Sequence, residues 1–310
     1  MPINESYRRR VAQLLRILPL VEPEECFALK GGTAINLFIR DMPRFSVDID
    51  LTYLPVEPRP QSLAGIDTAM RRIENRIKKS IAGAHTALSE HEGAVTKVMV
   101  TVDGAQVKIE TTPVLRGCVF DPQSRDVSPA VEDAFGFATM RLVSFADLYA
   151  GKLLAALDRQ HPRDLFDVRD LLANEGIGDD LRRAFLVYLI SHDRPMAEVL
   201  NARRKNLEQS FAREFEGMTP EPVSLDQLLA TREEMIEEIV GQMPDQHRRF
   251  LISFERGEPD WSILGSPHVS DLPAVRWRQI NLDKLTDEKR ARLVTELENS
   301  LAISGNSKAQ

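Results

Sequence analysis

Cysteine and long apolar runs are scarce in this sequence of 310 residues. Its two cysteines, Cys26 and Cys118, both lie among apolar residues, so we expect reduced thiols and no disulfide framework. No apolar run approaches the roughly 18 residues that a membrane-spanning helix needs. No charged-then-apolar leader is apparent at the N-terminus. We therefore expect a cytoplasmic protein without a membrane-spanning part.

An excess of positive charge is also missing. The sequence has 40 Lys and Arg residues against 47 Asp and Glu residues, which gives a net charge of −7. A protein that covers nucleic acid over much of its surface usually carries a net positive charge. Any contact with RNA would therefore need a local basic patch. The apolar fraction of 43 % allows a sizeable core, and the length suits one large domain or two ordinary ones.

A glycine turn opens the most informative stretch of the chain. A short apolar strand, residues 27–29, leads into Gly31-Gly32-Thr33, and we expect a helix over residues 34–39. Glycines let backbone N–H groups come close to an anion, and a helix N-terminus favours negative charge. An isolated Gly-Gly pair is usually only a turn. Here the backbone and the threonine hydroxyl are candidates for cradling phosphates.

A strand with two aspartates follows that helix. Side chains alternate between the two faces of a strand, so Asp48 and Asp50 project from the same face, while Ile49 faces the core. Paired carboxylates on a rigid strand suit Mg²⁺, which binds a few protein oxygens together with substrate phosphates. A lone Asp-x-Asp is often a solvated strand end. Together with the glycine turn, the pair predicts a site for Mg²⁺ and a nucleoside triphosphate.

This order of motifs resembles the signature of the polymerase-β-type nucleotidyltransferases. The closer pattern Arg44-x-Ser46-x-Asp48-Ile49-Asp50 is similar to that of the AbiEii/MenT family, the toxin nucleotidyltransferases of bacterial toxin–antitoxin and abortive-infection systems. The resemblance implies transfer of a nucleoside monophosphate from a nucleoside triphosphate. It also adds Arg44 and Ser46 to the candidate substrate-binding residues.

A hairpin is expected over residues 95–111, because Asp103-Gly104 separates two alternating strands. Lys108 and Glu110 share one face of its second strand, and we count both as candidate substrate-binding residues. In the wider nucleotidyltransferase fold, a third carboxylate lies on a strand beside the Asp-x-Asp pair, and Glu110 is the candidate for that place. The alternative is an ordinary surface strand that carries Lys and Glu.

A second block of the AbiEii/MenT pattern lies on two expected helices, 147–157 and 163–172. In this sequence it reads Lys152, Ala155, Arg159, Arg163, Asp164 and Asp167. The resemblance implies that Lys152 contacts the triphosphate and that an aspartate of the second helix completes the pocket. Asp164 and Asp167 both qualify, and we favour Asp167. The alternative is an internal set of salt bridges that joins the two helices.

We predict an α+β protein with a nucleotidyltransferase core, a mixed sheet with flanking helices, over residues 1–135. A helical domain over residues 136–310 would complete the active-site cleft. The predicted catalytic residues are Asp48, Asp50, Lys152 and Asp167. Of these, Asp48 and Asp50 would bind Mg²⁺. We also expect a long amphipathic helix over residues 65–88. Its basic residues are either solvated or face tRNA: Arg71, Arg72, Arg76, Lys78 and Lys79.

The family implies RNA as the acceptor, above all the 3′ end of tRNA, where added nucleotides block translation. It also implies a cognate antitoxin encoded beside the gene. Three alternatives remain open. The same site could transfer AMP to a protein, it could serve a kinase-like or nucleotide-binding role, or the chain could be a non-catalytic nucleotide-sensing or interaction module. The intact Asp48 and Asp50 pair argues against the last of these.

Overall fold

The structure, a computed structural model, describes residues 5–306, with side chains described as far as Leu301. The described chain forms two compact units. Unit 1 runs to Ser144 and includes Gly217–Pro222, whereas unit 2 comprises Phe145–Glu216 and the chain from Val223 onward. The domain division at residues 135 and 136 stays a prediction.

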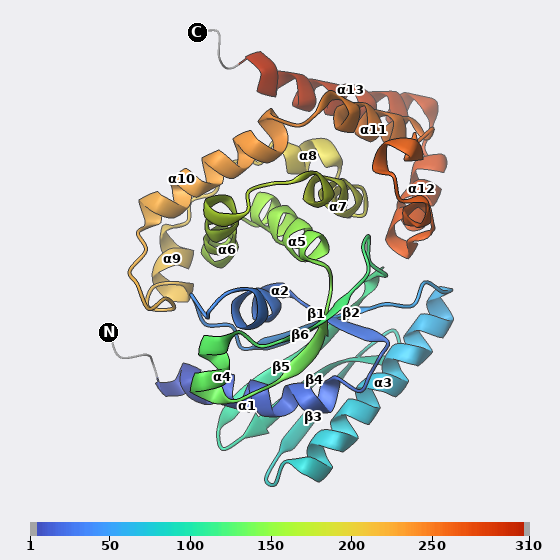
Figure 1. The fold of residues 1–310 in the computed structure, drawn as a ribbon. Coiled ribbons are helices and arrows are strands. Elements are labelled where there is room, and N and C mark those ends of the chain that lie inside the picture. The colour runs from blue at the N-terminus through green and yellow to red at the C-terminus, as the bar shows by residue number, and fades with distance from the viewer. Residues whose placement is uncertain (1–4, 307–310) are drawn as a thin grey trace. The chain divides into compact units, whose positions relative to one another are not determined.

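Unit 1 is built on a seven-stranded sheet with the strand order β3-β4-β5-β2-β1-β7-β6 (Figure 1). The β2–β5 and β1–β7 pairs are parallel and the others antiparallel, so the sheet is mixed, as predicted. Its elements are α1 (Glu5–Val21), β1 (Phe27–Lys30), α2 (Gly31–Ala34), the π-helix η1 (Ile35–Ile39), β2 (Asp48–Tyr53), α3 (Arg59–Ser80), β3 (His85–His91), β4 (Ala94–Val102), β5 (Ala105–Arg116), β6 (Gln123–Asp126), α4 (Pro129–Phe135) and β7 (Thr139–Leu142).

Helices α1 and α3 pack on one face of this sheet, where they contact β5 and β4 (Figure 1). Strands β4 and β5 alternate between buried and partly exposed residues over most of their length. Val98, Val100 and Ile109 are buried, whereas Lys108 and Glu110 are only partly covered. The apolar side chains thus form the core beneath the helices, and the polar ones occupy the opposite face of the sheet.

The predicted hairpin is confirmed, and its turn fixes the register of β4 against β5. Asp103 and Gly104 both have positive φ angles, 49° and 77°, as a two-residue type I′ turn requires. Val102 consequently pairs with Ala105, and each further pair steps outward along the two strands. This register decides which charged side chains meet on the open face.

Helix α3 begins earlier and ends earlier than the sequence predicted. Pro58 and Pro60 set its first turn, and it ends at Ser80, before Gly83 with its φ of +74°. The segment expected to continue the helix instead forms β3, which pairs with β4. The predicted helix was too long because Ile81 continues the helical spacing of apolar residues. Ile81 is buried, but it lies just beyond the end of α3.

Unit 2 is entirely helical in its described residues, as predicted. Its helices are α5 (Phe145–Asp158), α6 (Pro162–Asn174), α7 (Asp179–Ile190), α8 (Met196–Leu200), α9 (Glu208–Glu214), α10 (Leu225–Ile236), the π-helix η2 (Glu237–Gly241), α11 (Asp245–Arg256), the 3₁₀ helices η3 (Trp261–Leu264) and η4 (Pro267–Asp271), α12 (Pro273–Asp283) and α13 (Asp287–Asn306). The predicted α+β class is therefore confirmed.

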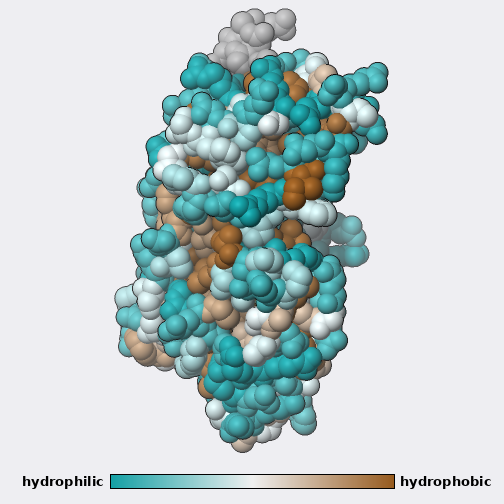
Figure 2. All heavy atoms as spheres, turned by 90° about the vertical axis from the view of Figure 1, so that its right-hand side faces the viewer, coloured by the Kyte–Doolittle hydropathy of each residue, from teal (hydrophilic) through white to brown (hydrophobic). Residues whose placement is uncertain are grey.

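Apolar side chains on the surface are few and scattered. The large hydrophobic residues that stand exposed are Val56, Val114, Phe137, Trp277 and Ile280. The face drawn in Figure 2 shows small apolar patches among polar atoms. Of the helices that the structure describes, none combines the length and the apolar character needed to cross a membrane.

Candidate active site

Four charged side chains line up across four neighbouring strands of unit 1. Asp50 of β2 pairs with Lys30 of β1 and with Glu110 of β5, and Glu110 pairs with Lys97 of β4. Directly paired residues project from the same face of a sheet. This charged row, Lys30–Asp50–Glu110–Lys97, therefore places two carboxylates between two ammonium groups. Asp48 precedes Asp50 by two residues, shares its face, and has a side chain that is 42 % exposed.

Gly31 lies directly against the charged row. Its φ is +75°, and a Cβ added to it would lie 2.8 Å from Oδ2 of Asp50. Real Cβ atoms essentially never have a neighbour so close. Only glycine therefore permits both the turn and this position of the Asp50 carboxylate. The structure thus brings together the glycine turn and one of the two predicted metal-binding aspartates.

Gly32 is enclosed by the two other residues of the motif. A Cβ there would lie 2.6 Å from an Arg44 guanidinium nitrogen and 2.9 Å from the Ser46 hydroxyl oxygen. Arg44 is only 3 % exposed and donates a hydrogen bond of 2.9 Å to the Phe45 carbonyl. A buried guanidinium beside the first turn of α2 makes this turn favourable for an anion.

Thr33 serves the structure in a way that the sequence did not predict. Its side chain is fully buried, and the hydroxyl donates a hydrogen bond of 2.5 Å to the Asp48 carbonyl oxygen. The same hydroxyl lies 3.1 Å from the Ser46 hydroxyl. Thr33 thus ties the glycine turn to the start of β2, and the expected contact of its hydroxyl with phosphate stays a prediction.

Lys108 brings a positive charge close to three carboxylates. Its Nζ lies 2.8 Å from Glu110 and 3.8 Å from Oδ2 of Asp48. Burial alone would lower the pKa of Lys108, but the hydrogen bond to Glu110 and the charges of Asp48 and Asp50 raise it. The ammonium therefore stays charged. Such partly exposed pairs contribute about 1 kcal/mol or less to stability, so they do little for the fold.

Glu110 has both carboxylate oxygens engaged. Burial works to raise its pKa, but hydrogen bonds from Lys108 and Lys97 outweigh it and lower the pKa. The Lys97 ammonium lies 2.9 Å from the other oxygen. An ionised carboxylate held by two ammonium groups is a weak proton acceptor. This arrangement fits the alternative of a Lys–Glu strand, and a third catalytic carboxylate at Glu110 stays a prediction.

Burial disfavours the charged forms of Asp50 and Lys30, two other residues of the charged row. Burial raises the pKa of Asp50, and although the Lys108 and Lys30 charges oppose this effect, the Asp48 carboxylate adds to it. Burial lowers the pKa of Lys30 in spite of the nearby carboxylates. A carboxylate in such a position gains stability from any further cation that binds beside it.

The donor set suits a hard divalent cation. Two strand carboxylates of β2 offer oxygen ligands on one face, beside a glycine where a Cβ would fill the space. Among the described residues, no group of three or more His, Cys, Asp or Glu side chains could hold a metal by itself. The protein thus provides a partial coordination sphere, which is typical of Mg²⁺ sites that substrate phosphates and water complete.

In unit 2, the second block of the motif forms a buried ion cluster between α5 and α6. Nζ of Lys152 lies 2.9 Å from Asp164 and 3.0 Å from Asp167. Arg159 adds two bonds to Asp164, of 2.5 and 2.8 Å. Lys152 is 7 % exposed, and each aspartate is 1 % exposed. These contacts correspond to the alternative of internal salt bridges that join the two helices.

Asp164 is held as an anion in this cluster. Burial alone would raise its pKa, but the charges of Lys152 and Arg159 and their hydrogen bonds hold the pKa far below the ordinary range. Asp164 and Asp167 are equally covered, so burial does not select one of them as the residue that faces a substrate. The assignment of Lys152 and Asp167 to the triphosphate stays a prediction.

Sequence reasoning missed Lys30 and Lys97. A signal for Lys97 was present, because a two-residue turn at Asp103-Gly104 dictates that residue 97 pairs with Glu110. Lys30 had no comparable signal, since its pairing with Asp50 depends on how β1 and β2 associate across a long connection. Lys97 forms an ion pair with Glu110, and Lys30 lies in register with Asp50.

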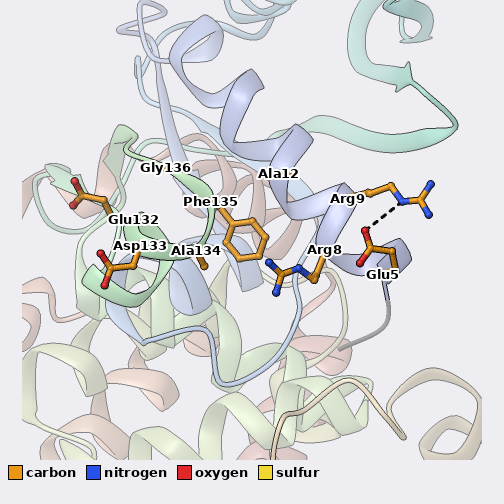
Figure 3. Close-up of a pocket in the computed structure, with 9 residues that line it drawn as sticks. All are labelled: Glu5, Arg8, Arg9, Ala12, Glu132, Asp133, Ala134, Phe135 and Gly136. Atoms are coloured by element: carbon orange, nitrogen blue, oxygen red, sulfur yellow. Dashed lines mark ion pairs between the residues drawn. The ribbon is translucent and has the colours of Figure 1, made fainter. Parts of the chain in front are cut away.

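A cavity of unit 1, about 500 Å³ in volume, is lined by residues of α1 and by the chain from Glu132 to Gly136. Figure 3 shows Arg8 directed toward Phe135, and the guanidinium carbon lies 5.5 Å from the ring centre. Glu132 and Asp133 point away from that pair in the same view. No residue of the glycine turn or of β2 lines this cavity, so it is separate from the candidate active site.

Comparison with known proteins supports the chemistry of this site. Residues 13–278 match the family model described as nucleotidyl transferase AbiEii toxin, type IV toxin–antitoxin system. No curated protein matches the chain. Among solved structures, MenT4, a nucleotidyltransferase toxin from Mycobacterium tuberculosis H37Rv, is similar with a TM-score of 0.54 and 17 % identity. The alignment covers 98 % of this chain and 95 % of that one, so the two share a fold.

Proposed function

We propose that this protein transfers a nucleoside monophosphate from a nucleoside triphosphate to RNA, since the chain belongs to the AbiEii family of nucleotidyltransferase toxins of type IV toxin–antitoxin systems. The observation that carries the proposal is the approach of Gly31 to the Asp50 carboxylate, which joins an anion-binding turn to a pair of metal-binding oxygens. The family also implies a cognate antitoxin.

The residues of unit 1 divide into two groups in this reaction. Asp48 and Asp50 would hold Mg²⁺ against the triphosphate, and the backbone N–H groups of the Gly31-Gly32 turn would orient the phosphates. When bound, the ion supplies charge neutralisation on the α-phosphate and on the departing pyrophosphate. Lys108 and the Arg44 guanidinium add fixed positive charge beside the same phosphates.

The chemical step is an in-line substitution at the α-phosphorus. The acceptor hydroxyl oxygen forms a bond to that phosphorus, the bond to the β-phosphate bridging oxygen breaks, and pyrophosphate leaves with the electron pair. The hydroxyl proton passes to water. Positioning and charge stabilisation supply most of the acceleration in such reactions, because the protein forms no covalent bond. From the family pattern, Lys152 and Asp167 are further candidate catalytic residues, and both belong to the buried ion cluster of unit 2.

The acceptor that the family implies is the 3′ end of tRNA, where an added nucleotide would prevent aminoacylation and block translation. The experiment that tests this proposal incubates the purified protein with Mg²⁺, bulk tRNA and each α-³²P-nucleoside triphosphate in turn. We expect label on tRNA with one or more nucleotides. We also expect Asp48→Asn to reduce labelling by at least about a hundredfold, since one metal-binding oxygen is lost.

Asp48→Asn is a sharper test than a substitution of Lys152. The Asp48 side chain is 42 % exposed, so its loss leaves the fold intact, whereas Lys152 belongs to a buried ion cluster. Removing one partner from such a cluster costs about 3 to 5 kcal/mol, so lost labelling could reflect unfolding. Label on total protein but not on tRNA would replace this proposal by protein adenylylation. Full labelling by Asp48→Asn would refute the assigned site.

A further inference from the structure

A loop of unit 2 carries three consecutive basic residues that the proposed reaction does not use. Arg203, Arg204 and Lys205 are all exposed, and with Arg194 they line a cavity of about 490 Å³. We call residues 202–206 the basic loop. No motif of the sequence analysis includes it, and it lies between α8 and α9.

The basic loop is held in place by buried side chains, so its conformation is fixed. Gln160 is 1 % exposed, donates a hydrogen bond of 2.8 Å to the Arg203 carbonyl, and accepts one of 3.1 Å from the Lys205 N–H. Arg232 is 8 % exposed and donates a bond of 3.0 Å to the Lys205 carbonyl. Ala202 opens the loop with a φ of +39°, an uncommon value outside glycine.

This scaffold contacts only main-chain atoms of the loop, and therefore leaves the basic side chains to project outward. Arg204 pairs with Glu233 at 2.6 Å, and Nζ of Lys205 donates to the Asp158 carbonyl at 2.8 Å. With the described residues, the exposed side chain of Arg203 forms no ion pair. Arg194 pairs with Asp158 and Glu198. Lys205 likewise pairs with no carboxylate of the described residues, so Arg203 and Lys205 supply the positive charge of the loop that stays available to an anion.

The chemistry of the cavity indicates phosphate groups. None of the large hydrophobic side chains that stand exposed among the described residues lines it, and its charged residues are four basic ones, Arg194, Arg203, Arg204 and Lys205, against two acidic ones, Asp158 and Glu198. Protein partners usually need a buried aromatic or aliphatic anchor, whereas a nucleic-acid backbone is bound by Lys and Arg through its phosphates. Arginine suits phosphate in particular, because its planar guanidinium binds two oxygens at once.

The basic residues of α3 are less suited to bind phosphate, because carboxylates of unit 1 pair with most of them. Arg72 and Arg76 both bind Glu24, a carboxylate that is 3 % exposed, at 2.6 Å each. Arg71 binds Asp67 and Lys78 binds Glu74. Most of the positive charge that the sequence placed on α3 is thus neutralised within unit 1.

We propose that the basic loop of unit 2 is a binding site for the phosphodiester backbone of the acceptor RNA. This inference rests on the proposed function for the identity of the RNA. Backbone binding here would be independent of base sequence, and would explain how a protein of net charge −7 retains a polyanionic acceptor.

The test measures RNA binding without catalysis. Fluorescein-labelled bulk tRNA is titrated with the full-length protein in the absence of nucleoside triphosphate, at several salt concentrations, with fluorescence polarisation as the readout. For R203E/K205E we expect affinity to fall at least about tenfold near 0.1 M salt. The negative slope of log K against log salt should become less steep by about one to two, since each phosphate contact contributes roughly 0.7 to 0.9 to its magnitude.

The matched control is K289E/R292E, which changes the net charge equally at one exposed lysine and one exposed arginine of α13. It should change the affinity by less than about twofold, because neither residue borders the cavity. Circular dichroism and urea unfolding check that both variants fold. If R203E/K205E unfolds, R203Q/K205Q replaces it, with a smaller loss of affinity expected.

Unchanged tRNA affinity in R203E/K205E would overturn the inference, as would equal losses in both pairs. Intact RNA binding with lost binding of the purified antitoxin would overturn it in favour of a protein partner. The two proposals can fail separately. If the wild-type protein binds tRNA through the loop but does not label it, the binding site stands and the transfer reaction to tRNA falls. If tRNA is labelled and the loop variant binds normally, only the binding site falls.

Discussion

Gly31 and Gly83 have almost the same φ angle but very different surroundings. Their φ angles are +75° and +74°, and a Cβ would meet Asp50 at the first position and nothing within 4 Å at the second. A substitution at either glycine therefore places a side chain at a positive φ, which costs of order 1 kcal/mol. Only the substitution at Gly31 would also displace a residue of the charged row.

We expect Gly31→Ala to reduce nucleotide transfer at least about tenfold, because the Asp50 carboxylate must move away from the turn. Gly83→Ala is the control, and should lower the free energy of unfolding by about 1 kcal/mol while keeping transfer intact. Urea unfolding and labelling with α-³²P-nucleoside triphosphate measure the two effects. Equal activity in the two variants would show that the position of Asp50 beside the turn is unimportant.

At the scale of single residues, short-range rules predicted which side chains share a face, and long-range packing decided which of them come into contact. Alternation along β2 correctly placed Asp48 and Asp50 on one face, since it depends only on neighbours in sequence. The hydroxyl of Thr33 was assigned to phosphate, yet its nearest acceptor is the Asp48 carbonyl. That acceptor comes close only after β1 and β2 pair, which no local pattern reveals.

At the scale of elements, α5 and α6 are joined by charge as well as by apolar contact. Asp164 is buried between Lys152 and Arg159, and its pKa lies far below the ordinary value of 3.8. A carboxyl group whose pKa is lower in the folded state adds stability above its unfolded pKa and loses it as the pH falls further. The contribution of Asp164 should therefore be complete near pH 6 and decline below about pH 4.

Asp164→Asn tests this linkage. At pH 7 we expect the free energy of unfolding of the variant to lie about 3 kcal/mol below that of the wild type, because Lys152 keeps only one carboxylate partner. The difference should narrow as the pH falls from about 4 to about 3. Urea titrations across this pH range measure it, with Asp193→Asn, at a side chain that is 93 % exposed, as the control. A difference that stayed constant with pH would contradict the stabilising role assigned to the Asp164 charge.

The ends of elements were predicted less well than their type. The hairpin of β4 and β5 was correct because its turn has a specific chemistry at Asp103-Gly104. Helix α1 contains Pro19 in its last turn and still continues to Val21, although Pro19 has no N–H to donate to the carbonyl four residues earlier. For helices such as α3, apolar spacing predicted that a helix forms, and tertiary contacts determined where it ends.

At the scale of the whole molecule, a segment from the middle of the helical half belongs to the sheet-containing unit. Gly217–Pro222 is part of unit 1, where the Met218 carbonyl accepts a hydrogen bond of 3.1 Å from the Phe45 N–H. The Met218 side chain is 6 % exposed. No sequence pattern indicated this excursion, because the segment resembles an ordinary Gly- and Pro-containing loop.

We expect Met218→Ala to destabilise unit 1 by about 2 kcal/mol, since it removes a buried side chain. Amide hydrogen exchange followed by mass spectrometry should show faster exchange around Phe45. Met243→Ala removes a similarly buried methionine of unit 2 and should leave Phe45 protected. Faster exchange confined to α9 in Met218→Ala would argue against the placement of this segment.

The way in which Gln160 and Arg232 support residues 202–206 also bears on how this protein can change over evolutionary time. Because both anchors bind carbonyl and amide groups, residues 203 and 205 can be exchanged without removing the contacts that shape the loop. If the loop binds a phosphodiester backbone, relatives can change the strength of that binding at these surface positions alone. A library randomised there, on an otherwise unchanged chain, would vary affinity for a polyanion while keeping the fold.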